Sequence, residues 1–240
     1  VLGTGNSIWL ERASYPVASA AFVQKIEAKL VQDDELFHAA VLSFGAFGFI
    51  HGVMLETEPL YLLECYRQRL PYNNQLQQLM QTLDFNSAAF LPHGNERPFH
   101  FQVVVNPYDM NDGVYVTIMY KRTYTTNYQP WIRDFSKAGP GDDAPAFLGK
   151  LAATVPLLSP LVVNNLVKIT YAPFDNVWGT SGEIFYNTDA RGKIGSTAFG
   201  VPLQYVVQVQ ELLMDLNKTH GPFAGVFAYR YIKQSNATLA

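Results

Sequence analysis

Three glycines in a short apolar stretch constrain this chain more than any other feature. Gly45, Gly48 and Gly52 follow one another at spacings of three and four residues, and residues 49–57 continue as an apolar run. Because glycine has no Cβ, its backbone adopts positive φ angles and lets a ligand approach closely. The pattern predicts a tight turn that leads into a strand, and it fits either a structural turn or a cofactor-binding loop. The dinucleotide fingerprint does not fit, because its glycines are spaced differently and open a helix.

The segments on both sides of this turn help to decide whether it is a structural turn or a cofactor-binding loop. Residues 33–41 begin with three acidic residues, which suit the positive end of a helix dipole, and continue as Leu-Phe-His-Ala-Ala. After the turn, the extended run ends near Pro59. This order of features resembles one known segment, which has an acidic Leu-Phe-x-Ala helix, then a Gly-x-x-Gly turn with two hydrophobic residues, and then a strand that ends near a proline. It closes the flavin domain in FAD-linked oxidases of the vanillyl-alcohol oxidase / p-cresol methylhydroxylase family.

The resemblance is specific over residues 33–59. Over the rest of the chain it rests only on the order of the predicted helices and strands. Gly45, Gly48, Phe49 and Ile50 match the family's turn position by position, which implies that they contact the adenosine or pyrophosphate part of FAD. It also implies that residues 1–59 are the C-terminal part of an FAD-binding domain. Residues 60–240 would then be a substrate-binding cap domain, incomplete at its C-terminus, with a mainly antiparallel sheet and helices on one face.

The activity that this resemblance implies is oxidation of an alcohol or hydroxy carbon in a small-molecule substrate, with hydride transfer to the flavin. Family members also carry an N-terminal glycine-rich segment that binds the pyrophosphate, and no such segment occurs in this sequence. We therefore expect an internal fragment of a flavoprotein, one that neither holds FAD nor is active by itself. The substrate, the electron acceptor, the flavin linkage and the oligomeric state stay open.

Hydrophobic periodicity beyond Pro59 predicts an α+β fold with a largely antiparallel sheet. The predicted strands are residues 60–69, 99–105, 114–124, 197–203 and 223–232, with a brief strand at 183–186. The predicted helices are residues 73–83, 145–155, 160–167 and 204–216. Before Pro59 the pattern predicts a strand at 7–11, helices at 20–30 and 33–41, and a strand at 49–57.

Alternation of side chains along the predicted strands groups a set of polar residues. If the apolar residues of each strand pack under the helices, the opposite face collects His100, Gln102, Thr117, Lys121 and Arg230. Such a face could bind a hydroxylated or anionic substrate, with His100 accepting a proton and Lys121 or Arg230 stabilising negative charge. A solvated sheet face is the alternative interpretation of the same residues, the three catalytic candidates included.

Composition removes several classes of function. The net charge of −3 offers no electrostatic footprint for nucleic acid, and no apolar run is long enough to span a membrane. The single cysteine and the scattered histidines provide no metal-binding spacing, and no secretion signal is visible, so a cytoplasmic location is favoured. The aromatic content of 14% keeps a second hypothesis open, a non-catalytic α+β module that binds an apolar ligand or a protein partner.

Overall fold

The computed structural model describes residues 5–132, 139–141, 159–185 and 197–238. The chain forms two compact units, Val1–Glu58 with Ile232–Ala240, and Pro59–Tyr231. Residues 232–240, which the sequence assigned to the cap, therefore group with the first unit. A backbone hydrogen bond of 3.1 Å from the Thr238 amide to the His38 carbonyl ties that tail to it.

The first unit is built on two short parallel strands, β1 (Ile8–Glu11) and β2 (Lys29–Gln32). Helix α1 (Ala20–Lys25) connects them, and α2 (Asp34–Val41) follows β2. The predicted helix at 20–30 ends early, because Glu27 adopts a φ of 52° and the chain then pairs with β1. The helix at 33–41 is confirmed, and the Asp33 carboxylate caps it by accepting a hydrogen bond from the Leu36 amide.

The strand predicted at 49–57 is wrong. Residues 49–58 form no regular element, and none of them has a ladder partner among the described strands. A strand is stabilised by its hydrogen-bonded neighbour, so an apolar, β-branched composition is not sufficient to form one.

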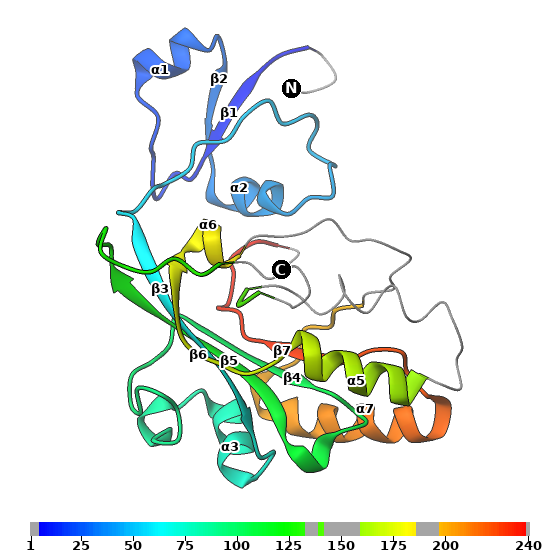
Figure 1. Ribbon diagram of the computed structural model, residues 1–240. Coiled ribbons are helices and arrows are strands. Elements are labelled where there is room, and N and C mark those ends of the chain that lie inside the picture. Colours follow the sequence, from blue (N-terminus) through cyan, green and yellow to red (C-terminus); the bar gives the residue numbers. More distant parts are fainter. Residues whose placement is uncertain (1–4, 133–138, 142–158, 186–196, 239–240) are drawn as a thin grey trace. The chain divides into compact units, whose positions relative to one another are not determined.

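The second unit is organised around a five-stranded antiparallel sheet (Figure 1). The spatial order of its strands is β6 (Phe174–Thr180), β3 (Tyr61–Leu70), β5 (Val114–Thr123), β4 (His100–Val105) and β7 (Phe227–Arg230). The α+β class and the antiparallel sheet are confirmed. In the part of the chain that the structure describes, no helix is long and apolar enough to cross a bilayer.

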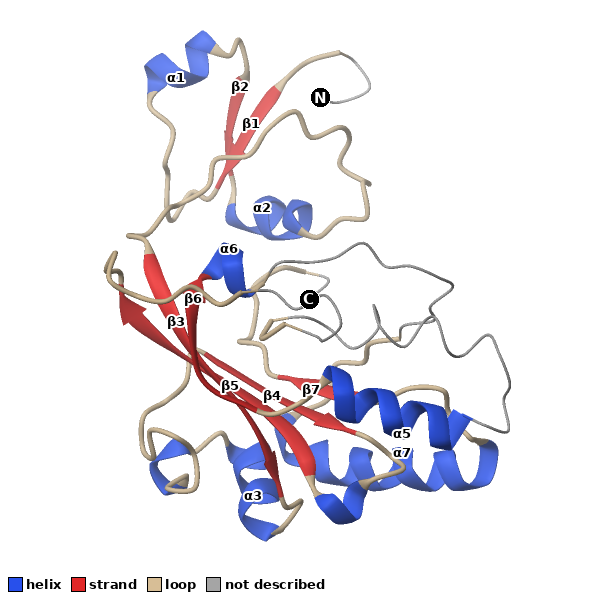
Figure 2. Ribbon diagram, in the orientation of Figure 1, coloured by secondary structure: helices blue, strands red, loops and turns tan. Residues whose placement is uncertain are grey.

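Helices cover both faces of this sheet, whereas the sequence predicted helices on one face (Figure 2). On the first face, α3 (Asn74–Thr82) and α7 (Val206–His220) pack over the main core, which includes Phe101, Val103 and Ile118. On the second face, α5 (Ser159–Thr170) packs against Val104 and Tyr115. Ile184 of α6 (Ser181–Ile184) packs against Leu63, Cys65 and Met119 at the other end of that face.

Two further strand predictions differ from the structure. Residues 183–186 were predicted as a brief strand, but α6 covers 181–184, and β6 forms in the preceding segment, where no strand was predicted. Residues 197–203 were predicted as a strand but form none, and a short 3-10 helix begins at Leu203. The predicted helix at 145–155 lies outside the described residues.

Candidate functional site

The glycine stretch forms two consecutive tight turns in the first unit. The Ala46 amide donates to the Ser43 carbonyl at 2.9 Å, and the Gly48 amide donates to the Gly45 carbonyl at 3.3 Å. The φ angles are 49° at Phe44, 80° at Gly45 and 105° at Gly48. A positive φ is strained for a residue with a Cβ, so the backbone at Gly45 and Gly48 favours glycine. These are also the two glycines that match the turn in the flavin-oxidase resemblance.

The turn leaves its backbone open. A Cβ placed on Gly45 would meet no atom within 4 Å. The two residues that follow the turn are also accessible, with exposed fractions of 71% for Phe49 and 68% for Ile50. An open glycine backbone allows a ligand to approach the main chain closely. The four predicted cofactor residues therefore lie together and are accessible.

In the second unit, a polar row crosses the second face of the sheet. The strand register places Arg67 of β3 opposite Thr117 of β5, Thr117 opposite Gln102 of β4, and Gln102 opposite Arg230 of β7. Gln102, Thr117 and Arg230, which the sequence predicted on one face, are therefore neighbours across paired strands. Gln102 and Thr117 are buried, whereas Arg230 is exposed, so the β7 end of the row is its accessible end.

His100 and Lys121 occupy the same face, further along the strands. His100 lies opposite Met119 and is partly exposed, with its ring centroid 5.8 Å from that of Phe185. Lys121 is exposed, and its Nζ lies 4.1 Å from the centre of the Tyr61 ring. The three catalytic candidates share one face but are distributed over it.

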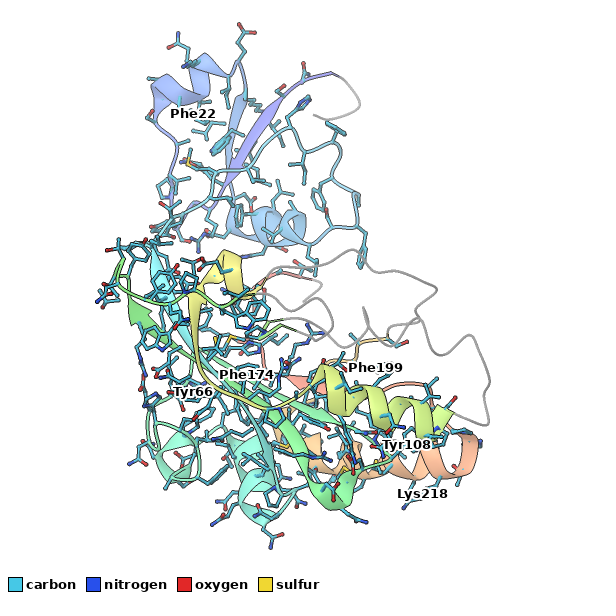
Figure 3. The ribbon with its side chains drawn as sticks, in the orientation of Figure 1. Phe22, Tyr66, Tyr108, Phe174, Phe199 and Lys218 are labelled. Atoms are coloured by element: carbon cyan, nitrogen blue, oxygen red, sulfur yellow. The ribbon has the colours of Figure 1, made fainter. Side chains whose placement is uncertain are left out.

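Arg67 is a member of this row that the sequence analysis missed. Its side chain is 1% exposed, its Nε donates to Thr117 Oγ1 at 3.2 Å, and its Nη2 donates to the Gly139 carbonyl at 2.8 Å. The guanidinium lies 4.9 Å from the ring centres of Tyr171 and Phe174, and Phe174 is labelled in Figure 3. Alternation along residues 60–69 places Arg67 with Leu63 and Cys65. The sequence therefore did contain a signal for Arg67, because it is a charged residue at a position that the alternation assigns to the apolar face.

A second polar cluster, also missed from the sequence, lies on the first face. The Glu64 carboxylate accepts hydrogen bonds from Tyr66 Oη at 2.5 Å and Arg122 Nε at 2.7 Å, and it lies 3.0 Å from His93 Nε2. Arg122 also donates to Glu96. Burial acts to raise the pKa of Glu64, but these hydrogen bonds outweigh it and the pKa is lowered. The cluster therefore holds an ionised carboxylate and ties the segment that carries His93 and Glu96 to the sheet.

The described residues contain no group of three or more histidine, cysteine, aspartate or glutamate side chains arranged to hold a metal ion. The described polar groups can thus orient a ligand, donate hydrogen bonds and supply positive charge on the second face of the sheet. Comparisons of the chain with protein-family models, with curated proteins and with solved structures found no match.

Proposed function

We propose that this chain is part of an FAD-dependent oxidoreductase that oxidises an alcohol or hydroxy carbon. One observation carries the proposal. Gly45 and Gly48 both adopt positive φ in a double turn that follows an acid-capped helix and is open at Gly45, which agrees with the helix and the turn of the flavin-oxidase resemblance. The strand at 49–57 that the resemblance also implied does not form. A flavin bound there would supply the chemistry that accepts hydride from the substrate carbon, and the protein would bind and orient both molecules.

The double turn binds the cofactor's adenosine or pyrophosphate part in this proposal. Residues with a Cβ at the φ of Gly45 are strained by about 1–2 kcal/mol, so an accessible backbone of this shape depends on glycine. Phe49 and Ile50 supply apolar surface on which an adenine ring can lie.

The second face of the sheet binds the substrate. The cationic groups of Arg230 and Lys121 stabilise negative charge on the substrate oxygen, and the His100 imidazole accepts its proton. Support comes from the strand register, which places all three residues on one face, and from the exposure of both cations.

The experiment is an absorption spectrum of the protein expressed from its complete gene, recorded with and without added FAD. We expect flavin bands that bleach under a substrate alcohol. Gly45→Ala should weaken FAD binding at least tenfold, because the turn must move to relieve strain. Gly94→Ala is the matched control, since Gly94 also has positive φ and open surroundings but lies in the other unit. A protein that stays colourless with added FAD would refute the proposal.

A second candidate function is binding of an apolar ligand or a protein partner without catalysis. Exposed apolar side chains in the first unit favour it, among them Phe44, Val53 and Leu55. Surface of this kind is often covered by a ligand or a partner. A protein that shows no flavin absorption and does not bind added FAD would be consistent with this second candidate.

A further inference from the structure

A pocket of about 580 Å³ lies at the outer edge of β6, in the second unit. It is lined by Asn127, Tyr128, Gln129, Pro130, Trp131, Ile132, Asn176, Val177 and Trp178. The segment before residue 133 runs parallel to β6 there. Pro130 forms a bridge with Trp178, and the Trp131 amide donates to the Trp178 carbonyl at 3.0 Å. Backbone pairing therefore joins the two walls of the pocket.

An irregularity in β6 shapes one wall. The pairing of β6 with β3 shifts register between Cys65 and Arg67, and in the same region Asn176 adopts a φ of 50°. Asparagine tolerates this left-handed conformation better than most residues, and bulges redirect side chains at strand edges. The Trp178 indole N–H donates to Asn176 Oδ1 at 2.6 Å. The bulge and this hydrogen bond together orient the indole ring.

The opposite wall is held by contacts outside the pocket. Tyr128 Oη donates to Glu183 Oε2 at 2.9 Å, and Glu183 also completes the capping box of α6 with Thr180. The Trp131 side chain packs against the cluster of Leu63, Cys65, Met119 and Ile184. The aromatic rings on this wall are therefore fixed by the fold before any ligand binds, which lowers the entropic cost of binding.

The chemistry of the lining selects one class of ligand. Two of the chain's three tryptophans are here, with Tyr128 beside them, and Asn127, Gln129 and Asn176 add amide groups. None of the described residues that line the pocket is charged. Aromatic faces contact the C–H face of a pyranose ring, and amides both donate to and accept from hydroxyl groups. A phosphate or carboxylate ligand would find no counter-charge among them, and a purely apolar ligand would leave the amides unused.

We propose that this pocket is a binding site for a neutral carbohydrate. It is a second site, separate from the polar row on the sheet, and it does not depend on the oxidoreductase proposal. The few contacts that an open pocket of this size offers imply a dissociation constant on the order of 1 mM for a disaccharide.

The test is a titration of the full chain with cellobiose, lactose and maltose, followed by ligand-observed NMR. At least one of them should bind saturably, and Trp178→Ala should weaken its binding at least tenfold. Trp9→Ala is the matched control, because Trp9 lies in the first unit beside Phe22 and should leave sugar binding unchanged. Thermal melts of each variant establish that it folds.

A milder pair of variants keeps the test decisive if Trp178→Ala fails to fold. Gln129 and Gln208 are both exposed, but only Gln129 lines the pocket. Gln129→Ala should weaken sugar binding several-fold and Gln208→Ala should not. Absence of saturable binding by all three sugars, or binding that Gln129→Ala and Trp178→Ala both leave unchanged, would overturn the proposal. Tighter binding of a sugar phosphate or of tetramethylammonium would also overturn it, by showing that the site selects charge.

Discussion

At the scale of single residues, Arg67 shows how a buried charge is made tolerable. Its guanidinium donates to Thr117 Oγ1 and to the Gly139 carbonyl, and two aromatic rings lie beside it. Arg67→Met should cost about 2–4 kcal/mol of unfolding free energy, because it leaves these buried acceptors without their donor. Urea denaturation measures the loss. Arg97→Met, at an exposed site, should change the free energy by less than about 0.5 kcal/mol, and an equal loss for both variants would contradict the argument.

Glu11 makes a pH-dependent contribution to the stability of the first unit. Hydrogen bonds from the Trp9 indole, the Gln32 amide and the backbone amides of Val17 and Ala18 lower the pKa of Glu11 from 4.5 to about 2. Because the folded-state pKa lies below the unfolded one, this stabilisation is fully present above pH 4.5. It is lost as the pH falls from 4.5 toward about 2.

Carboxyl NMR titration measures that pKa directly. Trp9→Phe should raise the pKa of Glu11, because the indole donor makes the largest contribution to its lowering. Gln24→Ala changes an exposed amide in the same unit that makes no side-chain hydrogen bond to Glu11, so it should leave the value unchanged. A Glu11 pKa near 4.5 in the unaltered chain would show that these hydrogen bonds are absent in solution.

At the scale of elements, the start of β5 depends on close backbone approach. Gly113 has a φ of 99°, and a Cβ placed there would lie 2.4 Å from the Leu70 carbonyl oxygen. Gly113→Ala should therefore destabilise the chain by about 2–4 kcal/mol, since backbone must move to admit the methyl group. Gly182→Ala is the matched control, because its site in α6 is open and helical and should tolerate alanine or gain up to about 1 kcal/mol. Thermal unfolding of both variants compares them, and equal melting temperatures would contradict the packing at Gly113.

Elements whose pattern and end signals agree could be predicted from the sequence. Asn73 caps α3, and Leu76, Leu79 and Met80 form its buried stripe, as helical spacing indicates. Strands β3, β4 and β5 also lie where alternation placed them. The sequence pattern could not predict that β2 forms a strand and that residues 49–57 do not, because strand formation depends on a partner far away in the sequence. Strand β6 was missed because its Asn and Gly residues belong to a bulged edge strand, which resembles a loop in composition.

The candidate site could be predicted only in part, for a related reason. Alternation within β4, β5 and β7 was sufficient to group Gln102, Thr117 and Arg230 on one face. It could not show that α5 and α6 cover much of that face, because packing between elements is not encoded in the periodicity of either one. Alternation was sufficient to place Arg67 with Leu63 and Cys65, but its position opposite Thr117 required the register between β3 and β5, which a single sequence does not specify.

At the scale of the whole molecule, the two units differ in how much they bury. Seven consecutive residues of β5, Val114–Tyr120, are buried, and three clusters of buried side chains surround the sheet. Among the described residues of the first unit, only Glu11 and Val23 are buried. Two short parallel strands and two short helices provide little cooperative stability without a larger core.

Native-state hydrogen exchange should therefore separate the units. Amides of β3, β4 and β5 should exchange only through global unfolding, whereas those of β1, β2 and α1 should exchange at least about a hundredfold faster through local opening. Mass spectrometry of exchanged peptides measures both sets in one sample, and the exposed peptide that spans residues 49–58 provides the fast reference. Protection of β1 and β2 equal to that of β5 would contradict this. It would mean that the first unit gains stability from interactions beyond those of its own described residues.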